Sequence, residues 1–199
     1  MKKFIFIATL FTASLSIAAA TTPQTSSAAT AKVTGGLKWT GYGVGKSHTG
    51  ELTVKSGTVE FKGEQLVGGT FVIDMTSLKT TDSPKLQGHL QSADFFDVQK
   101  FPEGTFKITR VEIIPNAKAG GATHKITGDL TIKGKTHSET LDATVAKGGT
   151  KWTAKAQTEI KDRTQYDIVY NSAKFKPASA LGDKLIDDKI KIELNLATQ

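Results

Sequence analysis

Alternation of apolar and polar residues is the feature that most constrains the fold of this chain. Residues 126–132, 141–145 and 190–196 place apolar or small side chains at every second position. A period of two is that of a β-strand with one face on a core and the other in solvent. The same pattern recurs earlier in the chain, where it slips by one residue near Thr109-Arg110, which predicts a β-bulge.

Short glycine-containing segments separate these alternating runs. Ser56-Gly57, Gly134 and Gly148-Gly149 are predicted to form turns. The chain then holds eight or nine strands, and most of the connections between them are short. This organisation indicates antiparallel pairing in an all-β fold, either a sandwich or a closed barrel.

Small side chains at inward positions favour a barrel with a cavity. Gly128, Ala143, Ala154 and Ala156 all fall on the inward face of their strands. A solid core would usually carry larger aliphatic residues there, whereas an eight-stranded barrel lined partly by small residues has room for one ligand. The alternative is that larger side chains from the opposite wall fill the space.

The first 20 residues have the order of a secretory signal. Two lysines precede the apolar run 4–17, and three alanines close the segment. Cleavage after it predicts a periplasmic or secreted protein without stable membrane insertion; the alternative is a retained anchor. Residues 21–34 are rich in Thr, Ser and Ala and are expected to form a disordered leader. Residues 35–199 then form one domain.

Composition excludes several classes of function. Cysteine is absent, which rules out disulfides, a lipid-modified cysteine and thiol catalysis. The formal charge of +7 is spread over single lysines rather than a basic block with aromatics, so nucleic-acid binding is not expected. The four histidines lack ligand spacing, and neither a nucleophile elbow nor a phosphate-binding loop is found. We therefore predict no metal, no cofactor and no enzyme activity.

Two segments break the strand pattern and are expected to lie over one end of the barrel. In residues 78–102, Ser83 is a predicted helix N-cap with Pro84 at the first helical position. Residues 161–183 combine Arg163 with Tyr166, Tyr170 and Phe175, amphipathic side chains that suit the mouth of an apolar pocket. The candidate ligand-binding residues are Trp39, Phe71, Leu86, His89, Leu90, Phe95, Phe96, Phe106, Trp152, Arg163, Tyr166 and Tyr170.

Each of these residues also has a purely structural interpretation. The aromatic side chains could simply form the core. Arg163 could form a salt bridge with Asp94 or Asp167 instead of facing a ligand head group. His89 could face a head group or cap nearby backbone carbonyls. The pattern alone leaves these alternatives open.

Four ordered motifs resemble those of the YceI-like family: LQGHLQSADFFDVQKFPEGTFKIT, HKITGDLTIKGKTHSETLDATV, DRTQYDIVY and LGDKLIDDKIKIEL. The resemblance implies an exported protein with a lipocalin-like eight-stranded antiparallel barrel and one short capping helix after the fourth strand. It also implies an isoprenoid chain in the barrel interior. The first strands depart from the family's form, because Trp39, Gly41 and His48 stand where an Asp and a His-Ser pair are expected.

The resulting hypothesis is an exported, non-catalytic carrier of an isoprenoid-type lipid, either a polyisoprenoid or an isoprenoid quinone. One alternative is an enzyme of isoprenoid lipid metabolism. Another is a stress-related interaction module whose barrel is filled by its own side chains. The sequence leaves the oligomeric state open, a homodimer included.

Overall fold

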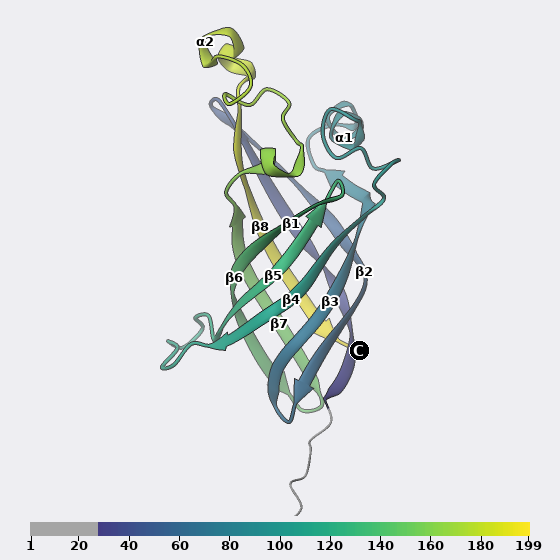
Figure 1. Ribbon diagram of the computed structural model, residues 1–199, viewed down its shortest axis with the longest axis vertical. Helices are drawn as coiled ribbons and strands as arrows, with labels where there is room; N and C mark the ends of the chain where they lie inside the picture. Colours follow the sequence, from purple (N-terminus) through teal and green to yellow (C-terminus); the bar gives the residue numbers. More distant parts are fainter. Residues whose placement is uncertain (1–27) are drawn as a thin grey trace, which may run out of the picture.

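The computed structural model describes residues 28–199, and the predicted signal segment lies outside them. Each strand pairs antiparallel with the next, and β1 pairs with β8, so the sheet closes into a barrel (Figure 1). This confirms the predicted eight-stranded antiparallel barrel. The strands are β1 (Ala29–Gly43), β2 (Lys46–Lys62), β3 (Gln65–Thr80), β4 (Glu103–Ile113), β5 (His124–Ile132), β6 (Lys135–Gly148), β7 (Lys151–Ile160) and β8 (Ile186–Thr198).

The helical elements gather at one end of the barrel, drawn at the top of Figure 1. They are α1 (Pro84–Gln91), α2 (Ala178–Leu181) and the two 3₁₀ helices η1 (Arg163–Tyr166) and η2 (Gly182–Lys184). The predicted cap of α1 is confirmed: the backbone N–H of Leu86 donates to the Ser83 side chain over 3.2 Å, and Pro84 occupies the first turn. None of the helices in residues 28–199 is both long and apolar enough to span a membrane.

Several details of the strand pattern are confirmed. The pairing of β4 with β5 shifts register between Ile108 and Arg110, where the sequence predicts a bulge. Gly134 and Gly149 adopt positive φ angles of 70° and 62° in the turns that follow β5 and β6. Glycine reaches this left-handed region without steric cost.

The predicted turn at Ser56-Gly57 is wrong, because β2 runs through it. Gly57 pairs with Phe71 on β3, and a Cβ atom on Gly57 would lie 2.9 Å from the Phe71 ring. The glycine therefore makes room for an aromatic side chain. Leu52 and Val54 are buried before this point and Val59 and Phe61 after it, and the one-residue change in this alternation comes from a register shift between Val54 and Ser56. Because residues 46–62 form one strand and not two, α1 follows the third strand, β3, and the prediction that it follows the fourth strand is wrong.

Part of the predicted disordered leader, residues 29–34, belongs to a strand. β1 begins at Ala29, and its residues from Ala29 to Lys32 pair with β2 between Thr58 and Phe61. Val33 is buried. Composition missed this extension because the long β2 strand supplies backbone hydrogen-bond partners whatever side chains the facing residues carry.

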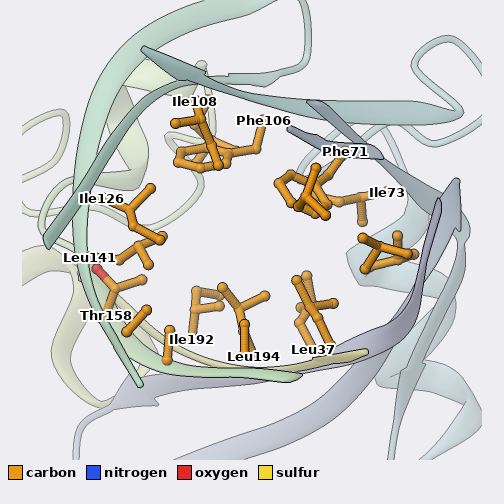
Figure 2. A pocket seen from close by; sticks show the side chains of 18 of the residues that line it. Leu37, Phe71, Ile73, Phe106, Ile108, Ile126, Leu141, Thr158, Ile192 and Leu194 are labelled. Atoms are coloured by element: carbon orange, nitrogen blue, oxygen red, sulfur yellow. The ribbon is translucent and has the colours of Figure 1, made fainter. Parts of the chain in front are cut away.

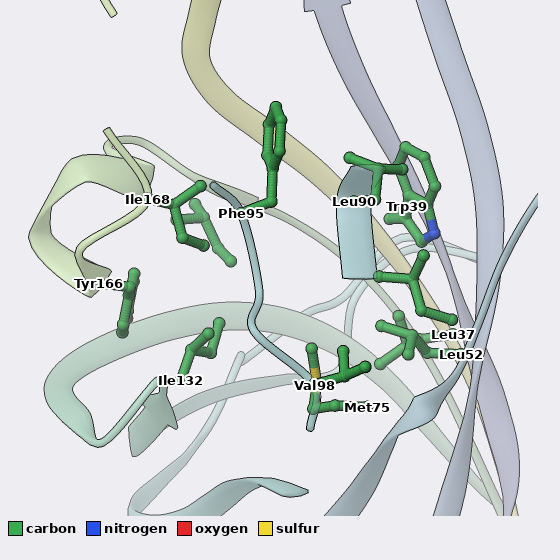
Figure 3. Packing of buried hydrophobic residues seen from close by; sticks show 12 residues of the cluster. Leu37, Trp39, Leu52, Met75, Leu90, Phe95, Val98, Ile132, Tyr166 and Ile168 are labelled. Atoms are coloured by element: carbon green, nitrogen blue, oxygen red, sulfur yellow. The ribbon is translucent and has the colours of Figure 1, made fainter. Parts of the chain in front are cut away.

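Buried apolar residues form two clusters along the barrel axis. One lies near the helical end and includes Leu37, Trp39 and Tyr166 (Figure 3). The other lies toward the opposite end and includes Phe71 and Leu141. The same strands contribute to both clusters: β1, for example, carries Leu37 in the first and Val33 in the second.

Candidate functional site

An elongated apolar cavity occupies the barrel interior, and we name it the inner chamber (Figure 2). All eight strands contribute to its wall, and the cavity has a volume of about 170 Å³. Phe61 and Trp152 stack at 4.5 Å between ring centroids and belong to the cluster away from the helical end. The labelled side chains in Figure 2 point inward and leave the centre open.

The small inward residues behave in two ways. Ala143, Ala154 and Ala156 line the inner chamber, as the cavity hypothesis requires. Gly128 does not, because a Cβ atom there would lie 2.5 Å from the Phe106 ring. At this position a large side chain fills the space, which is the alternative that the sequence left open.

A second cavity lies at the helical end, and we name it the outer chamber. Its volume is about 290 Å³. Its wall combines aromatic and aliphatic side chains with two histidines, His48 and His89, and its rim carries Lys46, Lys184 and Lys189, all exposed. The outer chamber is thus the more polar and more cationic of the two.

The structure brings all but one of the predicted ligand-binding residues to these two walls. Phe71, Phe96, Phe106 and Trp152 line the inner chamber. The outer chamber is lined by Trp39, Leu86, His89, Leu90, Phe95, Phe96, Arg163 and Tyr170.

Tyr166 is the exception. Its side chain is fully buried in the apolar cluster near the helical end and lines neither chamber. Its hydroxyl donates a hydrogen bond of 2.9 Å to Glu139, and burial together with this carboxylate raises the pKa of Tyr166 far above its usual range. Tyr166 therefore fastens η1 to the wall instead of facing the cavity.

The two adjacent phenylalanines occupy different places. The Phe95 ring lies 5.0 Å from His89 and 5.2 Å from Tyr170, between ring centroids, and lines only the outer chamber. Phe96 lines both chambers. His89 does not cap a backbone carbonyl: its Nε2 lies 3.0 Å from an Asp94 carboxylate oxygen.

Arg163 points into its own loop. Its guanidinium donates to the carbonyls of Ile168 at 2.6 Å, Tyr170 at 2.9 Å and Asp187 at 3.0 Å. Its charge partner is Asp188 at 3.4 Å, so the predicted pairing with Asp94 or Asp167 is wrong. Burial lowers the pKa of Arg163, and the nearby carboxylates oppose that change.

Glu139 is an inward-facing charged residue that the sequence analysis missed. Glu139 is the one charged side chain among the described residues of the inner-chamber wall. It stands two residues before Leu141 on β6, so the period of two could have placed it inside. Its Oε1 accepts hydrogen bonds from Tyr166 and from Gln165, which hold the carboxylate against η1.

Among residues 28–199, no three His, Asp or Glu side chains converge at a spacing that could hold an ion.

Fold and cavity define the class: a closed antiparallel barrel whose interior is an elongated apolar chamber with a more polar chamber at one end. The chain belongs to the YceI-like family, because the model of the YceI-like domain matches residues 12–198.

Individual known proteins are similar to this chain in sequence or in fold. A UPF0312 protein of Vibrio campbellii is 38% identical over 82 residues, 41% of this chain and 40% of the relative, so the match spans about two fifths of that relative's length. The crystal structure of BcnA from Burkholderia cenocepacia has a TM-score of 0.64 at 24% identity and covers 83% of this chain and 96% of its own.

A second solved structure is described as a polyisoprenoid binding domain from Saccharophagus degradans implicated in plant cell wall breakdown. It has a TM-score of 0.58 at 11% identity and covers 85% of this chain and 98% of its own. At these identities the two structural similarities establish the fold.

Proposed function

We propose that this protein is an exported, non-catalytic carrier of one isoprenoid-type lipid, a polyisoprenoid or an isoprenoid quinone. The apolar chain would lie in the inner chamber and the polar head group in the outer chamber. The observation that carries the proposal is the continuous apolar wall that eight strands build around open space.

The shape of the inner chamber suits a long chain. Its lining on β8 extends from Ile190 to Thr198. At a rise of about 3.3 Å per residue and a strand tilt of about 40°, these residues span roughly 20 Å of the barrel axis. Each buried CH₂ group would contribute about 0.8 kcal/mol before the cost of ordering the chain is subtracted.

The outer chamber suits a polar head group. Lys46 and Lys184 place ammonium groups at the rim, and Tyr170 and Asn171 add a phenol and an amide to the wall. Cationic and neutral donors of this kind bind phosphate, carbonyl or hydroxyl oxygens. The polyisoprenoid named for the Saccharophagus degradans neighbour is consistent with such a ligand.

The filled-barrel alternative conflicts with the open inner chamber. The enzyme alternative would require a side chain in the inner chamber that can transfer a proton. Glu139 is the charged residue there, and its carboxylate accepts hydrogen bonds from Tyr166 and Gln165. Export rests on the signal-like segment 1–20. Incubation of the purified protein with prenyl lipids tests for catalysis, and we expect the lipids to be recovered unchanged.

A pair of adjacent substitutions tests the carrier. Ala156→Phe places a ring in the inner chamber, whereas Lys155→Phe places the same ring on the exposed outer face of β7. Both variants and the parent protein are purified from the native host, and their lipids are extracted for mass spectrometry. We expect stoichiometric prenyl lipid from the parent and from Lys155→Phe, and much less from folded Ala156→Phe. Equal lipid content in the two variants would contradict the proposal.

A further inference from the structure

The two chambers meet at three side chains. Leu52, Phe96 and Ile190 are the residues of the described chain that line both cavities. Leu52 belongs to β2 and Ile190 to β8, so both are part of the barrel wall. Phe96 comes from the segment that connects α1 to β4, and it is the one residue of the described inner-chamber lining that does not lie on a strand.

Backbone hydrogen bonds fix the segment that carries Phe96. The N–H of Phe96 donates to the carbonyl of Leu90 over 3.1 Å, and the N–H of Val98 donates to Gln91 over 3.0 Å. Asp97 takes a positive φ of 48°, and its N–H donates to Ser92 over 2.8 Å. The Phe96 ring is therefore held at the junction by a turn folded back onto α1.

The anchor of this turn reaches the barrel wall. The side-chain amide of Gln91 donates to the carbonyl of Leu78 on β3 over 3.0 Å, and Leu90 and Val98 are buried beside Leu78 in one apolar cluster. A ring carried by a turn with buried flanks moves less freely than a side chain on an exposed loop. The Phe96 ring is consequently a fixed part of the boundary between the two chambers and not a mobile cover.

We infer that Phe96 is a specificity-determining residue, the neck between the two chambers. It admits a single slender chain into the inner chamber and keeps bulky groups, such as fused rings or a second chain, in the outer chamber. This inference rests on the proposed function. It adds that the bound lipid has one unbranched or methyl-branched chain next to a larger head group, and that the head group stays on the helical side of Phe96.

The two tryptophans of the chain allow each chamber to be followed separately. Trp152 lines the inner chamber and Trp39 lines the outer chamber. In a Trp39→Phe background, the fluorescence of Trp152 reports entry into the inner chamber. In a Trp152→Phe background, Trp39 reports occupancy of the outer chamber. Every comparison of necks is made within one background, so effects of the tryptophan substitutions themselves cancel.

The test titrates lipid-stripped protein with geranylgeraniol, a slender chain, and with cholesterol, a fused-ring probe. With Phe96 in place, we expect geranylgeraniol to change Trp152 fluorescence and cholesterol to leave it unchanged. In Phe96→Ala, cholesterol should reach Trp152, with discrimination reduced about tenfold or more, the scale of shape selection in apolar pockets. Phe96→Tyr keeps a ring of similar size and adds no tryptophan, so it should preserve the discrimination.

Phe101→Ala is the matched control. It removes the same ring from the same connecting segment, at a position that lines neither chamber. We expect it to discriminate like the parent protein. If cholesterol reaches Trp152 past Phe96, or if Phe96→Ala keeps the parent's discrimination, the neck is refuted while the carrier stands. If geranylgeraniol affects neither tryptophan, the proposed function itself fails.

Discussion

Replacing Arg163 with Met should strongly destabilise the protein. The sequence predicts that Arg163 binds a ligand at the mouth of the cavity, but its hydrogen bonds indicate a structural role. The side chain is 2% exposed and donates to two carbonyls of the segment between η1 and β8 and to the Asp187 carbonyl on β8. Met has a similar length but donates no hydrogen bond. The substitution therefore leaves these carbonyls without their donor and Asp188 without its cation.

The size of the effect follows from the buried charge. Removing one partner of a buried ion pair costs about 3–5 kcal/mol, because the remaining charge is left uncompensated. The other carboxylate oxygen of Asp188 accepts a hydrogen bond from the buried Ser172 over 2.9 Å. The Asp188 side chain is 17% exposed, so solvent offsets only part of the lost interaction. We expect a loss near 4 kcal/mol, a large part of the total stability of about 5–15 kcal/mol typical of a domain.

Urea denaturation followed by circular dichroism measures this loss. With a slope of about 2 kcal/mol per molar urea, the midpoint should fall by roughly 2 M. Adding Asp188→Asn, which removes the stranded charge and keeps an acceptor for Ser172, should recover part of the loss. A midpoint shift below roughly 0.5 M in Arg163→Met, or no recovery in the double variant, would refute the structural role of Arg163.

Three further predictions concern other parts of the barrel. Phe61→Ala removes a buried ring stacked on Trp152 and should cost about 3 kcal/mol, seen as a lower melting temperature. Ser83→Ala removes the α1 cap and should cost about 1 kcal/mol, whereas Ser83→Asp should not. The raised pKa of Tyr166 stabilises the fold fully below pH about 10, its unfolded pKa, and this contribution falls at higher pH. Alkaline denaturation should be less steep in Tyr166→Phe.

The barrel and its bulge could be predicted from the sequence because both depend on the alternation of apolar and polar residues within single strands. Alternation decides which face of a strand is apolar, and a slip of one residue at Arg110 shows where the face changes. The cap of α1 was equally accessible, since Ser83 and Pro84 act within one turn. Gly57 was misjudged because its role depends on Phe71, a residue of the neighbouring strand.

The candidate site could be predicted only as a set of residues. Aromatic residues outside the strand pattern pointed to the helical end, and Phe95 and Phe96 do lie there. Their different roles depend on how the turn after α1 folds back, which local patterns do not specify. Arg163 and Tyr166 were assigned to the cavity because of their residue type. Arg163 does line the outer chamber, but Asp188 pairs with its charge, and Glu139 holds Tyr166 away from both chambers.

Native mass spectrometry of the mature protein, purified from its native host without detergent, tests the central claim most directly. The account predicts one non-covalent adduct per chain, with the mass of a prenyl lipid, that is lost when the protein is unfolded. A bare chain both in this preparation and after incubation of the refolded protein with polyprenol would contradict the carrier.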